Sequence, residues 1–208
     1  VPGVRRGGCA GGRPAGVWLA SVGGEAEGGG PVRACDVEGH RGAGGRAPEN
    51  TLAAVRRARD IGVTTIETDI AVTKDQIPVV SHNPNLVPEL VRDATGKWLT
   101  EPGPSIHSLT LEQWRRYDIG RLNPATRYAR EFPEQRASDG ERFPTLREAL
   151  RLVGSASTPV RLNIEPKLTP ANAGDTVDAK NCVRLSLDAL REAKVQDGVT
   201  NGPSGWGR

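Results

Sequence analysis

The chain has 208 residues, a length that fits one domain. Its 28 Lys and Arg residues nearly balance its 25 Asp and Glu residues, and the net charge is only +3. No basic stripe with interleaved aromatic residues occurs, so we expect no nucleic-acid partner. No apolar run approaches the roughly 20 residues of a membrane-spanning helix, so we also expect no membrane span.

Residues 1–34 differ in character from the rest of the chain. They are rich in glycine and arginine around a short apolar patch, GVWLASVG. We expect a disordered or signal-like leader that does not pack against the domain formed by residues 35–208. Cysteines at positions 9, 35 and 182 have no CxxC spacing, which indicates neither a zinc site nor a disulfide framework. Cys35 and Cys182 are expected to be small buried residues.

From Cys35 onward the sequence predicts a strand, a helix and a strand. The segment ACDVEG is the first strand and delivers His40 at its end. The helix NTLAAVRRARDIG follows, with Asn50 as its N-cap and Gly62 as its end. TTIETDIAVT is the second strand, so the three elements form a βαβ unit. After a turn, IPVVSH is a further strand that ends at His82.

Residues 84–143, the insertion, are rich in proline and charge and too long for an ordinary loop between strand and helix. We expect one helix in it, beginning at Thr110. Its aromatic residues either line a substrate mouth or form a small core of their own, and their spacing favours the core. These residues are Trp98, Trp114, Tyr117 and Tyr128.

The last third of the chain predicts a helix, a strand and a helix. Thr145 opens the helix FPTLREALRLVG, which leads into the strand VRLNIEPK. NCVRLSLDALREAKV is an amphipathic helix. The final segment, VQDGVTNGPSGWGR, shows neither a strand nor a helix pattern.

Two acidic residues on the second strand indicate a cation site. Glu67 and Asp69 are two positions apart, so their side chains emerge on the same face. Such a pair must share a proton or be neutralised by a cation, and hard divalent ions prefer carboxylate oxygens. In the later strand the same alternation places Glu165 and Lys167 on one face. Glu165 is therefore a third candidate ligand.

The ordered motifs HRG, PENT, ETD, VVSH, FPTL and NIEPK, between about Cys35 and Lys167, resemble the glycerophosphodiester phosphodiesterase family, whose fold is a variant of the TIM barrel. The resemblance implies an acid/base pair of histidines, a Ca²⁺ or Mg²⁺ ion held by three acids, and two basic residues at the phosphate. The resemblance assigns the acid/base roles to His40 and His82, and the phosphate contacts to Arg41 and Lys167. It assigns the metal to Glu67, Asp69 and Glu165. Glu49 is expected to bind a backbone amide or Arg41 rather than the metal. One departure is Asn83, where many relatives have an aspartate.

A complete (β/α)₈ barrel has about 250 residues, and only three core strands are evident here. The expected fold is therefore α/β: a partial TIM barrel with an insertion after the second strand region and with the C-terminal half of the barrel missing. The chain is interpreted as a fragment, or as a product that left its reading frame near Lys194. The sequence leaves the oligomeric state open.

The function that the resemblance implies is metal-dependent hydrolysis of small glycerophosphodiesters to glycerol 3-phosphate and an alcohol, in lipid and glycerol metabolism. Two alternatives stay open. One is a phospholipase D-like phosphodiesterase acting on a lysophospholipid or sphingomyelin, and the other is an inactive fragment that binds metal or phosphate. A periplasmic or secreted location is expected, with the cytoplasm as the alternative.

Overall fold

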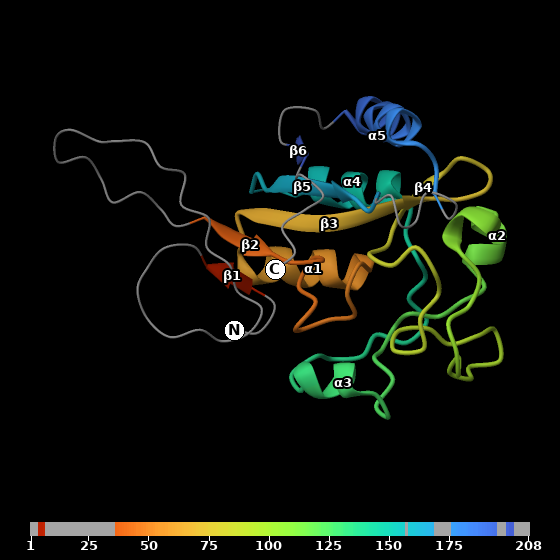
Figure 1. Cartoon of the computed structure of the whole chain (residues 1–208). Helices are drawn as coiled ribbons and strands as arrows, with labels where there is room; N and C mark the ends of the chain where they lie inside the picture. Colours follow the sequence, from red (N-terminus) through yellow and green to blue (C-terminus); the bar gives the residue numbers. More distant parts are fainter. Residues whose placement is uncertain (1–3, 7–35, 157, 169–175, 195–198, 202–208) are drawn as a thin grey trace, which may run out of the picture.

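The fold is built on a mixed sheet of six strands (Figure 1). The structure is a computed structural model, and it describes residues 4–6, 36–156, 158–168, 176–194 and 199–201. The strands are β1 (Val4–Arg6), β2 (Val37–Gly39), β3 (Thr65–Val72), β4 (Pro78–Val80), β5 (Arg161–Pro166) and β6 (Val199–Asn201). The helices are α1 (Leu52–Ile61), the 3₁₀ helix η1 (Ile106–Ser108), α2 (Leu111–Trp114), α3 (Arg127–Glu131), α4 (Leu146–Gly154) and α5 (Ala179–Ala193).

The strand order is β1-β2-β3-β5-β6, and β4 pairs separately with β3. Strands β2, β3, β5 and β6 run parallel, as the predicted βαβ unit requires, whereas β1 is antiparallel to β2 and β4 is antiparallel to β3. The sheet is therefore mixed, and its central strand is β3. The register of β3 against β5 places Asp69 directly opposite Glu165.

The two faces of β3 have different neighbours, because its side chains alternate. Ile66 and Ile70 point into a core shared with α1, α4 and α5, together with Leu162 and Ile164 of β5. On the other face lie Glu67, Asp69 and Ala71, of which Ala71 packs against apolar side chains of the insertion. All eight residues of β3 are buried, so its polar face is enclosed as well as its apolar one.

Helix α4 begins and packs as the sequence predicts. Thr145 is its N-cap, and Glu148 completes a capping box by accepting the Thr145 N–H at 2.8 Å. The apolar residues of α4 are buried at helical spacing: Leu146, Ala149, Leu150 and Val153.

Helix α1 ends at Gly62 as predicted, in the left-handed conformation, but its beginning differs from the prediction. The N-cap is Thr51, whose hydroxyl accepts the N–H of Ala54 at 3.1 Å. Asn50 has φ +55°, and its side chain points instead to Asp69 on β3. Asn50 and Thr51 are both good caps by residue type, so the cap assignment to Asn50 was wrong by one position.

The insertion, which carries α2 and α3 in Figure 1, packs around Trp114 and against Ala71 of β3 and Val79 of β4. Trp114 is fully buried and stacks on Phe143 at a ring distance of 3.9 Å. Tyr117 packs against the same cluster, so the interpretation of these aromatic residues as core is confirmed for Trp114 and Tyr117. It is wrong for Tyr128, whose hydroxyl reaches Arg41 and Glu49. Thr110 caps α2 as expected, but that helix has only four residues, and α3 was not predicted.

Two short strands differ from the expectations for the ends of the chain. Residues 4–6 pair with β2, although the leader was expected not to pack. The rest of the leader, which contains Cys9, lies outside the described residues, as does Cys35 at the start of the predicted first strand. Val199–Asn201 pair in parallel with β5, although no strand was predicted there. The sheet therefore continues past Lys194. Cys182 is buried in α5, as expected.

Within the described ranges, no helix is both long and apolar enough to cross a membrane.

Gly42 and Gly62 provide a matched test of the packing between the segment after β2 and α1. Both have φ near +82°, but a Cβ on Gly42 would lie 2.7 Å from the Cβ of Ala54, whereas one on Gly62 would meet no described atom within 4 Å. Gly62→Ala should lower the free energy of unfolding by roughly 1 kcal/mol, the cost of a left-handed alanine. Gly42→Ala should lose a further ~1 to 3 kcal/mol through overpacking.

Urea unfolding of the two variants and the unmodified chain measures this difference. Equal losses in the two variants would show that the segment after β2 does not pack closely on α1.

Candidate functional site

Two backbone hydrogen bonds join β3 to the segment after β2, which carries His40, and to the segment after β4, which carries His82. The N–H of Gly42 donates to the carbonyl of Glu67 at 3.0 Å, and the N–H of Ser81 donates to the carbonyl of Asp69 at 3.0 Å. His40 and His82 are thereby held beside the two acids. His40 follows parallel strand β2, whereas His82 arrives through the antiparallel hairpin of β3 and β4.

The three predicted acids meet at this point. Glu67, Asp69 and Glu165 each offer a carboxylate oxygen, and these oxygens all lie within 4.8 Å of one another. Glu67 is only 4% exposed and Asp69 is fully buried. Oε2 of Glu67 accepts the N–H of Arg41 at 2.7 Å, but its buried Oε1 has no hydrogen-bond partner among the described residues.

Two basic side chains contact the acids. Nε of Arg41 lies 3.5 Å from Oδ2 of Asp69, and its Nη1 donates to Glu49 at 2.6 Å. The predicted pairing of Glu49 with Arg41 is thus confirmed. Nζ of Lys167 lies 3.0 Å from Oδ1 of Asp69 and 2.6 Å from Oε1 of Glu165. Lys167 therefore links two of the acids that the sequence places on different strands.

The close approach of buried carboxylates separates their proton affinities. Burial and the negative charge of Asp69 raise the pKa of Glu67 well above its usual value. Burial also opposes ionisation of Asp69, but the charges of Arg41, His82 and Lys167 outweigh it and keep the pKa of Asp69 below its usual value. Without a further cation, the pair therefore favours a state in which Glu67 holds a proton.

Asn50 is a site residue that the sequence did not identify. Its Nδ2 donates to Oδ2 of Asp69 at 3.0 Å, and its Oδ1 accepts from the hydroxyl of Thr68 at 3.3 Å. Its backbone N–H donates to the carbonyl of Arg41 at 3.0 Å. The neighbouring Thr51 supplies the helix cap, which leaves Asn50 to orient the acid; the adjacent pair of cap-type residues was the available signal.

Arg41 has φ +53°, a strained value for a residue with a side chain. The hydrogen bonds of its N–H to Glu67 and of its carbonyl to Asn50 hold this conformation. The backbone of Arg41 is therefore fixed from both sides.

The two histidines have different surroundings. Nε2 of His40 lies 3.8 Å from Oε2 of Glu67. Nδ1 of His82 lies 2.9 Å from Oδ1 of Asn83, so Asn83 contacts the imidazole through its amide. Burial and the positive charge of Arg41 lower the pKa of His82 despite the opposing influence of Asp69 and Asn83. His82 is therefore biased toward its neutral form.

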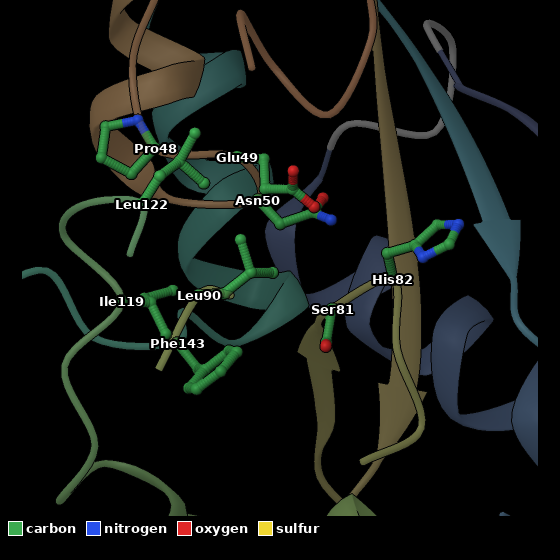
Figure 2. Close-up of a pocket in the computed structure, with 9 residues that line it drawn as sticks. All are labelled: Pro48, Glu49, Asn50, Ser81, His82, Leu90, Ile119, Leu122 and Phe143. Carbon is green, nitrogen blue, oxygen red and sulfur yellow. The ribbon is translucent and has the colours of Figure 1, made fainter. Parts of the chain in front are cut away.

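A pocket lies between this site and the insertion (Figure 2). Its polar end is formed by Glu49, Asn50, Ser81 and His82, and Figure 2 shows the apolar side chains on the opposite side. The apolar residues are Pro48, Leu90, Ile119, Leu122 and Phe143. The pocket therefore combines a histidine with an apolar wall supplied mostly by the insertion.

A family model described as the glycerophosphoryl diester phosphodiesterase family matches residues 40–200. The chain belongs to this family. Among curated members, glycerophosphodiester phosphodiesterase 1 of Homo sapiens is 42% identical over 113 residues, which cover 53% of this chain and 28% of that protein. A glycerophosphodiester phosphodiesterase of Caldanaerobacter subterraneus is 33% identical over 129 residues, or 62% of this chain and 44% of that protein.

Two solved structures are similar to the chain in fold. A chain from Silicibacter pomeroyi named as a glycerophosphoryl diester phosphodiesterase superposes with a TM-score of 0.74 at 34% identity, over 79% of this chain and 56% of that one. A phosphodiesterase from Oleispira antarctica, solved with the product sn-glycerol-3-phosphate, superposes with a TM-score of 0.53 at 22% identity, over 81% and 68%. The second likeness concerns the fold alone. The matched part of the chain thus covers 28% and 44% of the two curated relatives and 56% and 68% of the two solved chains.

The structure brings the seven predicted site residues to one edge of the sheet: His40, Arg41, Glu67, Asp69, His82, Glu165 and Lys167. It adds Asn50 and Tyr128, which sequence patterns assigned to a helix cap and to a core.

The surroundings of His82 predict its titration in metal-free protein. Its imidazole should titrate below the ordinary value of ~6.5, because burial and Arg41 disfavour the imidazolium. Arg41→Gln should raise this pKa, since the positive neighbour is lost while Asp69 remains. NMR titration of the ring protons in the presence of a chelator, with His82→Gln to assign the signal, measures both values. A pKa above 6.5 in the unmodified chain would contradict the geometry.

Proposed function

We propose that this chain is a metal-dependent phosphodiesterase that hydrolyses glycerophosphodiesters to glycerol 3-phosphate and an alcohol. The observation that carries the proposal is the meeting of three carboxylates at one edge of the sheet, with His40 3.8 Å from Glu67 and His82 close enough to Asp69 to lower its pKa. The names of the human and Caldanaerobacter relatives support the reaction class.

The residues present fit a divalent cation. The carboxylates of Glu67, Asp69 and Glu165 are hard oxygen donors of the kind that Ca²⁺ and Mg²⁺ prefer, and the buried Oε1 of Glu67 lacks a hydrogen bond within the described segments. Together with Glu49, these acids outnumber Arg41 and Lys167, which leaves an excess of negative charge. A bound cation would balance this charge and polarise a phosphoryl oxygen.

The protein side chains then have separate tasks. Arg41 and Lys167 attract the phosphate and place it over the acids, where their charges stabilise the transition state. His82, biased toward its neutral form, accepts the proton of the attacking oxygen. His40, beside the carboxylate of Glu67, donates a proton to the leaving alcohol. The attacking oxygen belongs to water or to a hydroxyl of the substrate itself.

One observation favours a second candidate substrate. The pocket beside His82 has an apolar wall that includes Leu90, Ile119 and Phe143. An apolar wall suits a substrate with a hydrocarbon part, such as a lysophospholipid. Analysis of the products from glycerophosphocholine and from a lysophospholipid separates the two candidates.

We also propose that the sheet is part of a (β/α)₈ barrel. Four parallel strands follow one another in the order β2-β3-β5-β6, the arrangement of consecutive barrel strands. The likeness to the Silicibacter structure, whose length is covered to 56%, supports this assignment. Residues 84–143 would then be an insertion between barrel units.

Turnover of glycerophosphocholine tests the proposed reaction. Chelation should abolish it, and His40→Ala or His82→Ala should each reduce kcat by roughly 10²- to 10⁴-fold, the usual contribution of an acid or base. His107→Ala is the matched control, because His107, on η1, contacts the carbonyl of Val72 at the end of β3 rather than the site. Unchanged turnover after chelation or after either site substitution would exclude the mechanism.

Metal binding tests the ligand assignment separately. Calorimetric titration measures the affinities for Ca²⁺ and Mg²⁺. In Glu165→Gln these affinities should fall by more than the roughly 10- to 100-fold that is typical when a hydrogen-bond partner of a metal ligand is lost. Glu112→Gln is the control, since Glu112 is exposed on α2 and pairs with Arg116. An unchanged affinity in Glu165→Gln would remove Glu165 from the ligand set. Metal binding without turnover would select the inactive fragment instead.

A further inference from the structure

Helix α3 of the insertion reaches the site through one side chain, Tyr128. Its hydroxyl donates a hydrogen bond to Oε2 of Glu49 and accepts one from Nη1 of Arg41 at 3.3 Å. The other oxygen of Glu49 accepts from the same Nη1 at 2.6 Å. Tyr128, Glu49 and Arg41 therefore form a closed triangle of hydrogen bonds, here called the arginine clamp.

The arginine clamp acts on a side chain that otherwise has much freedom. A long arginine side chain loses up to ~2 kcal/mol of rotamer entropy when it is fixed. Glu49 is itself buried, so its Oε2 needs a hydrogen-bond partner. Tyr128 supplies that partner, so that Glu49 and Nη1 of Arg41 are held in one arrangement before a substrate binds.

Other contacts fix α3 in place relative to Arg41. Nε2 of Gln135 donates to the carbonyl of Gly44 at 2.6 Å, and the N–H of Arg136 donates to the carbonyl of Arg46 at 3.0 Å. Arg46 also pairs with Glu134 at 2.9 Å. The segment after α3 is thus attached to the loop that begins at Arg41. Tyr128 is positioned by a rigid connection rather than by one hydrogen bond.

We propose that Tyr128 is a positioning residue, by which the insertion holds Arg41 in the orientation that binds the phosphate group of the substrate. The proposal rests on the proposed function only in taking Arg41 as the phosphate contact. It gives the insertion a second task besides forming the wall of the pocket: the insertion aligns a charge at the phosphate. Tyr128 does not touch the reacting atoms and acts through Arg41.

The first test needs no ligand. Tyr128→Phe removes the hydroxyl but keeps the ring, which packs edge-on against Phe132 at 5.1 Å, so the fold is retained. In this variant, ¹⁵N relaxation of the Nε–H group of Arg41 should show greater mobility. Tyr117→Phe is the matched control, because Tyr117 packs against Trp114 in the insertion core. Unchanged mobility of Arg41 in Tyr128→Phe would overturn the proposal.

The second test measures binding of inorganic phosphate by calorimetry with Ca²⁺ present. Tyr128→Phe should raise the Kd for phosphate roughly tenfold, as the loss of an indirect partner typically does, and Tyr117→Phe should leave it unchanged. In an Arg41→Lys background, Tyr128→Phe should change the Kd less than about twofold, because the clamp is already broken. Equal effects in both backgrounds would show that Tyr128 does not act through Arg41.

The two tests separate this proposal from the proposed function. If glycerophosphodiesters are not hydrolysed but Tyr128→Phe loosens Arg41 and weakens phosphate binding, the arginine clamp stands and the proposed function fails. If they are hydrolysed, Tyr128→Phe should raise KM more than it lowers kcat. Hydrolysis with KM, phosphate affinity and Arg41 mobility all unchanged in Tyr128→Phe would retain the function and remove the arginine clamp.

Discussion

The burial of two like charges on β3 is the constraint that shapes the site. Glu67 and Asp69 point to the same side of one strand and are almost entirely removed from water. Burying charge is costly unless it is compensated, so the surroundings supply Arg41, Lys167 and the amide of Asn50. The compensation is incomplete at Glu67, and this is where a cation would act. The same arrangement that costs stability thus favours a cation beside the two acids.

Much of the fold and of the site follows from local sequence patterns. Alternation on a strand places Glu67 and Asp69 on one face, and helical spacing identifies the buried residues of α4. Family motifs supply the two histidines and Glu165. The contact between Glu165 and Asp69 also needs the register of β5 on β3, which the pattern alone does not give.

The residues that escaped prediction are those whose role depends on distant partners. Asn50 and Thr51 are equivalent as caps by residue type, and only the position of Asp69 decides between them. Tyr128 has an aromatic ring like its neighbours in the insertion, yet its hydroxyl meets Glu49, 79 positions earlier in the chain. Strand β6 is short, and its pairing with β5 rather than its sequence defines it. Tertiary contacts outweigh local preference at all three.

The hairpin that carries His82 limits how this part of the chain can vary in length. Its turn is closed by the hydrogen bond from the N–H of Thr73 to the carbonyl of Ile77, and Val72 stands opposite Pro78. Since side chains alternate along a strand, a length change in this turn that shifted the register of β4 by one residue would reverse the side chains that precede the imidazole. The length of this turn therefore matters for the site, whereas the long segment of residues 84–143 follows His82 in the chain.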